Sequence, residues 1–171
     1  MNDNAVRVWE RESMTSFDTE CLRRAIALSR THMQGNAGGP FGAVIAREGR
    51  IIGEGWNCVT SSNDPTAHAE VVAIRNACRD LGSFSLAGAT VYTSCEPCPM
   101  CLSAIYWARI ERIVYANARD DAASIGFDDA FLYTEIALPL EQRAIPMQRL
   151  LADEARAVFD EWAARPDRIP Y

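Results

Sequence analysis

The spacing of apolar positions divides the chain into helical and extended stretches that alternate. Apolar side chains recurring three and four positions apart predict four helices, over residues 16–34, 66–81, 97–108 and 152–164. Ser16 is expected to cap the first helix and Gly35 to end it. Pro97 is expected to open the third, because proline suits the first turn of a helix.

Short apolar stretches bounded by turn residues predict strands over residues 41–47, 50–57, 88–94, 110–116 and 147–150. Glu48 and Gly49 predict a tight hairpin turn between the first two. A helix separates the third strand from the fourth, so these two should run parallel through a right-handed crossover. The alternation predicts an α/β fold, a three-layer α/β/α sandwich around a five-stranded mixed sheet. Between residues 119 and 146 only short elements are expected.

Length and composition narrow the function classes. A chain of 171 residues has the usual length of one domain, and 23 acidic against 17 basic residues give a formal net charge of −6. An acidic chain is a poor partner for phosphate, so no nucleic-acid partner is expected. All basic residues are Arg, which excludes a Schiff-base or P-loop lysine. With only His32 and His68, a three-histidine metal site within one chain is excluded.

The N-terminus and the cysteines favour a cytoplasmic protein. Residues 1–15 contain no apolar core of a secretory signal, and no apolar run is long enough to span a membrane. We expect residues 1–15 to form a flexible extension and residues 16–171 a single domain. Six cysteines are present, and in the cytoplasm a tight cysteine cluster more often indicates metal or redox chemistry than disulfides.

The chemistry is concentrated in His68-Ala69-Glu70 and, thirty positions after His68, in Pro97-Cys98-Pro99-Met100-Cys101. Cys98 and Cys101 should project from one side of a first helical turn, where the unpaired N–H groups favour thiolate. One histidine and two cysteines make a tetrahedral zinc site with one position open for water, the arrangement of a catalytic site. Glu70 is placed to move protons beside it.

Other interpretations of these residues remain open. Cys95 and Cys98 also form a CxxC pair, although a helix starting at Pro97 leaves Cys95 on the preceding turn. A non-catalytic, zinc-stabilised binding module would fold with zinc and turn nothing over. A thiol redox protein using Cys95 and Cys98 would cycle dithiols and hold no metal. The joint H-x-E…P-C-x-x-C pattern is typical of zinc deaminases.

At these residues the chain resembles the cytidine deaminase superfamily, and within it the small bacterial guanine deaminases. The matching stretches are residues 38–45, 62–70, 92–101, 104–109, 126–129 and 145–146, and the terminal Tyr171. The resemblance implies a zinc-dependent hydrolysis of guanine to xanthine and ammonia, with zinc hydroxide attacking C2 and Glu70 shuttling protons. It implies one zinc per chain on His68, Cys98 and Cys101. It also implies a homodimer in which the C-terminal tail closes the partner's site.

The resemblance further implies the residues that hold the base. Asp129 would contact the guanine edge and relay a proton, and the other substrate-binding residues would be Phe41, Asn57, Ala69, Trp107 and Tyr171. Guanine offers two donors on one edge, which suit a carboxylate, and its flat face suits aromatic rings.

All of these residues except Ala69 also have a structural alternative, which for Tyr171 is a disordered chain terminus. Asn57 could satisfy loop backbone, Phe41 and Trp107 could be packing residues, and Asp129 or Asp128 could cap a turn. Rival substrates are guanosine, cytosine, an aminotriazine and a tRNA adenosine, of which the acidic, lysine-free chain least favours the last.

Overall fold

The computed structural model describes residues 14–170 and divides into two compact units, Met1–Phe127 and Asp128–Tyr171. Residues 1–13, which make up most of the predicted N-terminal extension, and Tyr171 lie outside the described residues.

The first unit is built on a four-stranded mixed sheet in the order β2-β1-β3-β4. The strands are β1 (Gly42–Arg47), β2 (Arg50–Trp56), β3 (Thr90–Cys95) and β4 (Arg112–Asn117). β1 runs antiparallel to β2 and β3, while β3 runs parallel to β4. The predicted hairpin is confirmed, with positive φ at both Glu48 and Gly49, and so is the parallel pair.

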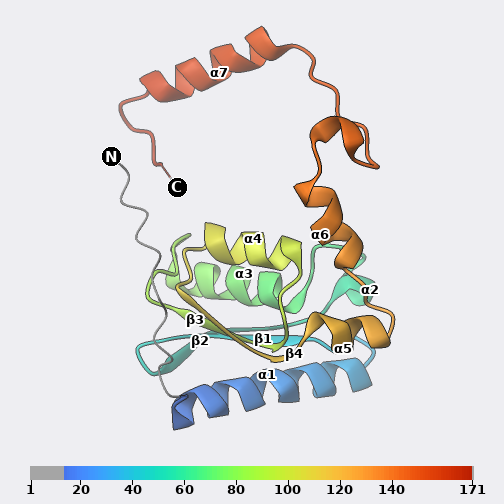
Figure 1. Cartoon of the computed structure of the whole chain (residues 1–171). Coiled ribbons are helices and arrows are strands. Elements are labelled where there is room, and N and C mark those ends of the chain that lie inside the picture. The colour runs from blue at the N-terminus through green and yellow to red at the C-terminus, as the bar shows by residue number, and fades with distance from the viewer. Residues whose placement is uncertain (1–13, 171) are drawn as a thin grey trace. The chain divides into compact units, whose positions relative to one another are not determined.

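Helices cover both faces of this sheet (Figure 1). α1 (Ser16–Gln34) lies against one face, and α3 (Ala69–Leu81) and α4 (Pro99–Trp107) lie against the other. The shorter helices are α2 (Val59–Ser62) and α5 (Arg119–Ser124). Side chains of β1 alternate between the layers: Val44 packs with the α1 cluster and Ile45 with the α3 and α4 cluster.

α1 begins as the sequence predicts, but its cap differs. Thr15, rather than Ser16, is the N-cap: its hydroxyl accepts from Asp18 N, and the Asp18 carboxylate accepts from Thr15 N. This reciprocal pair is a capping box, which needs an acidic or amide group three positions after the cap. Asp18 provides this group three positions after Thr15, whereas the residue three positions after Ser16 is Thr19, which has neither an acidic nor an amide group. Thr15 is therefore the residue that can form the capping box.

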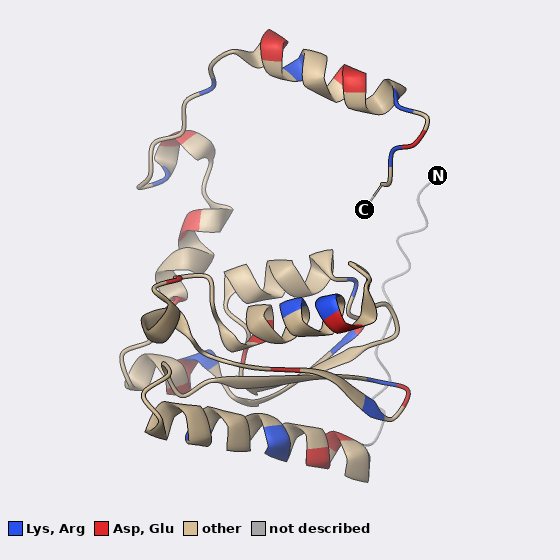
Figure 2. Ribbon diagram, turned by 180° about the vertical axis from the view of Figure 1, so that it is seen from behind, with Lys and Arg blue, Asp and Glu red and all other residues tan. Residues whose placement is uncertain are grey.

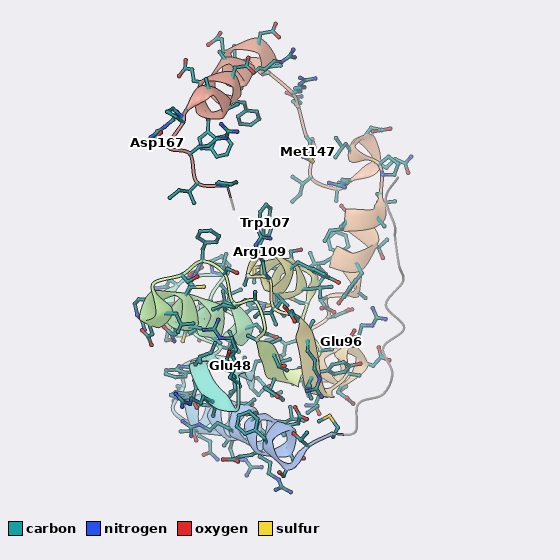
Figure 3. All side chains as sticks on the ribbon, turned by 90° about the vertical axis from the view of Figure 1, so that its left-hand side faces the viewer. Glu48, Glu96, Trp107, Arg109, Met147 and Asp167 are labelled. Carbon is teal, nitrogen blue, oxygen red and sulfur yellow. The ribbon has the colours of Figure 1, made fainter. Side chains whose placement is uncertain are left out.

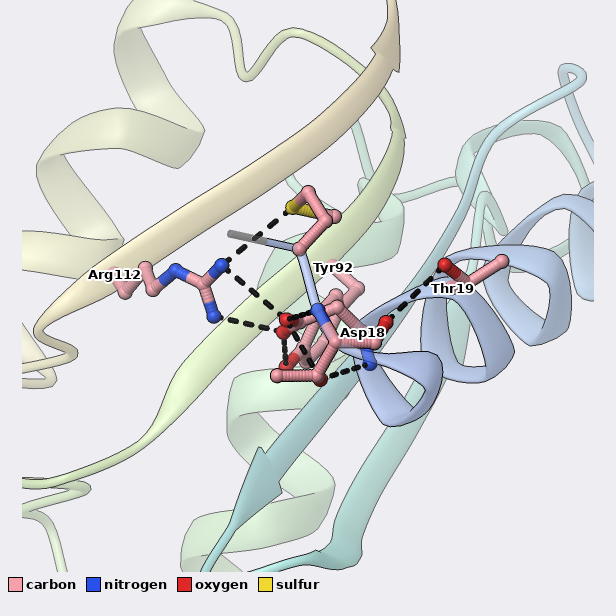
Figure 4. Close-up of polar contacts among 6 residues, drawn as sticks. Asp18, Thr19, Tyr92 and Arg112 are labelled. Atoms are coloured by element: carbon pink, nitrogen blue, oxygen red, sulfur yellow. Dashed lines mark hydrogen bonds and ion pairs between the residues drawn. The ribbon is translucent and has the colours of Figure 1, made fainter. Parts of the chain in front are cut away.

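Asp18 also ties α1 to the sheet (Figure 4). Its buried carboxylate accepts a hydrogen bond from Tyr92 Oη on β3 at 2.6 Å and an ion pair from Arg112 Nη1 on β4 at 2.7 Å. Burial alone would raise the pKa of Asp18, but hydrogen bonds from Arg112, Tyr92 and Thr15 lower it well below its usual range. Asp18 therefore carries a negative charge inside the fold.

Small residues let α3 approach β2 closely. A Cβ on Gly53 would lie 2.7 Å from the Cβ of Ala77, and one on Gly55 would collide with the backbone of Ala69 and Ala73. Real side chains do not make such close contacts, so glycine at these two positions sets the height of α3 above the sheet. The first turn of α3 follows directly from His68.

The second unit contains α6 (Ala130–Ala137), a short 3-10 helix, η1 (Leu140–Gln142), and α7 (Ala152–Ala164). α7 has the predicted bounds. The predicted fifth strand, residues 147–150, is wrong: this segment is exposed and has no strand structure. An apolar stretch becomes a strand only where a partner edge is available to its backbone, and the sheet of the described residues has four strands.

None of residues 128–170 is buried, although many of their side chains are large and apolar. Within residues 14–170, no helix combines the length and the apolar character needed to span a bilayer.

Candidate zinc site

His68, Cys98 and Cys101 come together on the α3 and α4 side of the sheet. Their ligand atoms all lie within 4.8 Å of one another. The Nδ1 atom of His68 is 3.6 Å from the sulfur of Cys98 and 3.5 Å from that of Cys101. In a tetrahedral site with Zn–S of about 2.3 Å and Zn–N of about 2.0 Å, sulfur and nitrogen ligands are about 3.5 Å apart. The three atoms therefore fit the spacing that zinc requires.

Two helix N-termini position these ligands. His68 is the N-cap residue of α3 and Cys98 the N-cap residue of α4, and neither side chain caps its own helix. α4 begins at Pro99, two residues later than predicted, which places Pro97 outside it. Cys98 and Cys101 still lie on one side of the first turn, because their separation of three residues is close to a helical period.

The two thiols have very different acidities. A hydrogen bond with Cys101 lowers the pKa of Cys98 to about 4, and the neighbouring His68 acts in the same direction. The hydrogen bond with Cys98, together with burial, raises the pKa of Cys101. The two sulfurs thus share a proton. Zinc binding would release this proton, because thiolate is the form of cysteine that binds zinc. The donor set thus fits zinc by spacing and by chemistry.

Cys95 lies outside this cluster. It ends β3, and its sulfur is 3.6 Å from the carbonyl oxygen of Ala118. The following residue, Glu96, joins the loop before α4 to the end of β4: its N–H donates to Asn117 O at 2.8 Å, and its carboxylate accepts from Arg119 N at 3.2 Å. Two hydrogen bonds therefore anchor the loop that carries Cys98 to the connection between β4 and α5.

Glu70 stands beside the ligands on α3. Its side chain is buried, and one carboxylate oxygen, Oε1, accepts a hydrogen bond from the hydroxyl of Thr93 on β3 at 3.0 Å. Burial raises the pKa of Glu70, while hydrogen bonds from its own N–H, Cys101 and Thr93 oppose the rise. Ala69, which precedes it, is fully buried in the core cluster of this face.

Asn57 follows β2 and is buried. Its side-chain oxygen accepts hydrogen bonds from Gly39 N at 3.1 Å and from Val59 N at 3.2 Å. This oxygen therefore satisfies loop backbone, which is the structural alternative expected from the sequence. Its amide nitrogen makes no hydrogen bond with any of residues 14–170. A Cβ on Gly38 would collide with Asn57, so this loop can pack on the amide only because glycine occupies the position.

Phe41 is half-buried and packs against the core cluster that contains Ala69. Its ring meets that of Phe127 edge-to-face, with centroids 4.9 Å apart and planes at 88°. A Cβ on Gly39 would lie 3.0 Å from Phe127, so the three residues fit closely. Phe127 was part of a matching stretch in the sequence and had no predicted role, because the sequence around a loop phenylalanine does not indicate such a contact.

The other expected base-binding residues are less enclosed. Trp107 ends α4 with 66% of its surface exposed, and its ring points away from the sheet (Figure 3). Asp129 belongs to the second unit and occupies the N-cap position of α6. The side chain that caps the turn there is that of Asp128, which accepts from Ala130 N at 2.9 Å. Tyr171 lies outside the described residues.

Residues 15–117 match the family model described as the cytidine and deoxycytidylate deaminase zinc-binding region, which is more than half of the chain. The chain belongs to this family. As a member of the zinc deaminases it is a zinc-dependent hydrolytic enzyme, and the expected family is confirmed.

Two curated proteins are similar to this chain to different degrees. The chain is 54% identical over 141 residues to a guanine deaminase of Bacillus subtilis (strain 168), covering 82% of this chain and 90% of the relative. It is 38% identical over 122 residues to a tRNA-specific adenosine deaminase of Haemophilus influenzae, covering 67% of this chain and 69% of the relative.

Solved structures match in the same way. The X-ray structure of guanine deaminase from Bacillus subtilis aligns with a TM-score of 0.87 and 50% identity over 90% of this chain and 98% of that one. The crystal structure of NE0047 in complex with 2,6-diaminopurine aligns with a TM-score of 0.63 and 28% identity over 94% of this chain and 87% of that one. The α/β cytidine deaminase-like fold with a mixed sheet is thereby confirmed.

Proposed function

We propose that this protein is a guanine deaminase, which hydrolyses the C2 amino group of guanine to give xanthine and ammonia. The observation that carries the proposal is the cluster of His68, Cys98 and Cys101 beside the buried Glu70, in a chain 54% identical to a guanine deaminase. In this proposal the three clustered residues hold one zinc ion per chain.

Glu70 does the proton chemistry in this account. A zinc ion in the cluster supplies Lewis acidity, which makes water a nucleophile near neutral pH. The carboxylate of Glu70 accepts a proton from that water and delivers it to N3 of the base. It then takes the proton of the new C2 hydroxyl and delivers it to the departing amino group, which leaves as ammonia while the C2 carbonyl of xanthine forms. Its burial keeps these transfers away from bulk solvent.

Five residues of the first unit supply or support the base pocket. We assign the backbone at Ala69 to the pocket floor and the rings of Phe41 and Trp107 to the faces of the purine. The edge-to-face contact with Phe127 supports the ring of Phe41. Because the oxygen of Asn57 is already bonded to Gly39 and Val59, its amide nitrogen acts as a donor to an acceptor atom of the base.

The second unit completes the site in a homodimer. We assign Asp129 to the donor edge of guanine and to a proton relay, and Tyr171 to the closing of the pocket. The exposed apolar side chains of residues 128–170 support this, because a segment without buried residues needs a partner surface. We propose that the segment is exchanged with a second copy of the chain, within one deaminase domain of residues 16–171 and in the cytoplasm.

A tRNA adenosine is the substrate of the relative that is 38% identical. The charge distribution disfavours it here. Asp and Glu share the helices with Arg, as on α1 and α3, so these helices present both signs of charge rather than a basic face for phosphates (Figure 2).

The test is a substrate panel on zinc-replete protein, with guanine, guanosine and cytosine incubated separately and ammonia release followed. We expect turnover of guanine and none of the other two. Glu70→Gln should lower the rate by about 10²–10⁴-fold, the usual contribution of a general acid–base group, with the zinc content unchanged. Glu20→Gln, an exposed site on α1, is the matched control and should behave as wild type.

Three other results would each contradict one part of the proposal. Preference for guanosine or cytosine would replace the substrate. Zinc-dependent folding without ammonia from any base would identify a binding module. A wild-type rate in Glu70→Gln would overturn the mechanism.

A further inference from the structure

Glu70 is attached to the sheet through one side chain, that of Thr93. The Thr93 hydroxyl donates to Oε1 of Glu70 at 3.0 Å, and this contact is buried. A hydroxyl has a single hydrogen to donate, so it engages one of the two carboxylate oxygens. The contact therefore makes the two oxygens of Glu70 inequivalent.

Thr93 is held in a position that allows little movement. It lies in β3, which is hydrogen-bonded on both sides, and it pairs with Ala43 of β1 and Tyr115 of β4. Its side chain is 1% exposed. A β-branched side chain has few rotamers available in such surroundings, so the direction of its hydroxyl is set by the strand.

Glu70, by contrast, has a longer and more flexible side chain in the first turn of α3. A carboxyl group that collects a proton from one place and delivers it to another has to hold the protonated oxygen toward the reacting atoms while it carries the proton. Rotation about its last bond would turn the protonated oxygen away from them and misdirect the transfer.

We propose that Thr93 is a positioning residue for the proton shuttle: its hydroxyl holds Oε1 of Glu70, so that the carboxyl group keeps one orientation while it transfers protons. This inference rests on the proposed deaminase function. It adds a residue from the central part of the sheet to a site otherwise built from helix N-termini and loops.

A purely structural role makes a different prediction. A buried threonine can donate to the nearest acceptor only to satisfy its own hydroxyl, and valine, which has the same shape, would then replace it with a change in stability alone. If Thr93 orients Glu70, valine should impair the chemical step in a protein that folds and binds zinc normally.

The test compares Thr93→Val with Thr93→Ser, which keeps a hydroxyl, and with Thr90→Val as the matched control. Thr90 lies on the same strand, and its hydroxyl makes no hydrogen bond with any of residues 14–170. For each protein, kcat and KM for guanine, zinc per chain and the thermal unfolding midpoint are measured. Thr93→Val is also made in the Glu70→Gln background.

We expect Thr93→Val to lower kcat by about 10–100-fold with KM within about threefold of wild type, the usual loss when a supporting hydrogen bond is removed. Thr93→Ser should recover most of that loss, and Thr90→Val should match wild type. Zinc content should be unchanged throughout. In the Glu70→Gln background, Thr93→Val should have no additional effect, because it acts only through that carboxylate.

Several results would overturn the inference. If the wild type is active and Thr93→Val has an unaffected kcat, the inference is rejected and the proposed function stays intact. The same follows if adding Thr93→Val to Glu70→Gln lowers the rate further. A loss of zinc in Thr93→Val would assign Thr93 a structural role instead. Wild-type protein inactive on every base would reject the proposed function and this inference together.

Discussion

At the scale of single residues, the carboxylate of Asp18 joins segments that are far apart along the chain. It takes part in the cap of α1 through Thr15 and binds Tyr92 of β3 and Arg112 of β4. The role of Asp18 could not be predicted from the sequence, because an acidic residue in the first turn of a helix is common on exposed surfaces. Only the fold brings its distant partners into reach.

We expect Asp18→Asn to lower the free energy of unfolding by about 2 kcal/mol, since it removes the charged hydrogen bonds that the carboxylate accepts from Tyr92 and Arg112. Urea titration measures this, and Asp80→Asn, an exposed pair on α3, is the control and should change little. Because the pKa of Asp18 is lowered on folding, its stabilisation is present above the unfolded value of 3.8 and is lost as the pH falls below it.

The difference between wild type and Asp18→Asn should therefore be constant from about pH 7 to 5 and shrink below about pH 4. An equal difference at pH 3 would contradict the assigned charge.

The site residues differ in how far their roles can be predicted from the local sequence. The ligands His68, Cys98 and Cys101 and the acid Glu70 were predicted from spacing and residue type, because two helix N-termini translate sequence separation directly into geometry. Thr93 and Phe127 were not given roles, since threonine in a strand and phenylalanine in a loop are ordinary. Their contacts come from segments that only the folded sheet juxtaposes.

At the scale of elements, the close approach of α3 to β2 places the first turn of α3 at the site. The sequence predicted the bounds of α1 and α7, the hairpin and the parallel pair, all of which follow from local periodicity. It failed for the strand at residues 147–150, because pairing depends on a distant edge. Neither the glycines of β2 nor their packing against α3 could be recognised without knowing which elements are neighbours.

We expect Gly55→Ala to lower the free energy of unfolding by about 1–3 kcal/mol, the usual cost of overpacking, and to weaken the retention of zinc. The added Cβ would push α3 away from the sheet and move His68 and Glu70 with it. Thermal unfolding and a chelator titration measure the two effects. Gly35→Ala is the control, since its Cβ would meet other atoms at ordinary distances of 3.5 Å and beyond. Unchanged zinc retention in Gly55→Ala would contradict the link between packing and site.

At the scale of the whole molecule, the two units differ in what they can do alone. The first contains the sheet, two core clusters and the metal-binding cluster. The second, which carries Asp129, has no buried residue among 128–170. The sequence predicted its main helix but not its lack of a core, because apolar residues on a helix indicate that a surface will be covered without indicating by what.

The central claim is that one zinc ion, held by His68, Cys98 and Cys101, supports the hydrolysis of guanine. The most direct measurement is the rate of xanthine formation from guanine as zinc is returned to metal-stripped protein. We predict no rate without zinc and a linear rise that ends at about one zinc per chain, as three ligands with one open position require. A full rate in protein free of metal, or no xanthine at full zinc occupancy, would contradict the account.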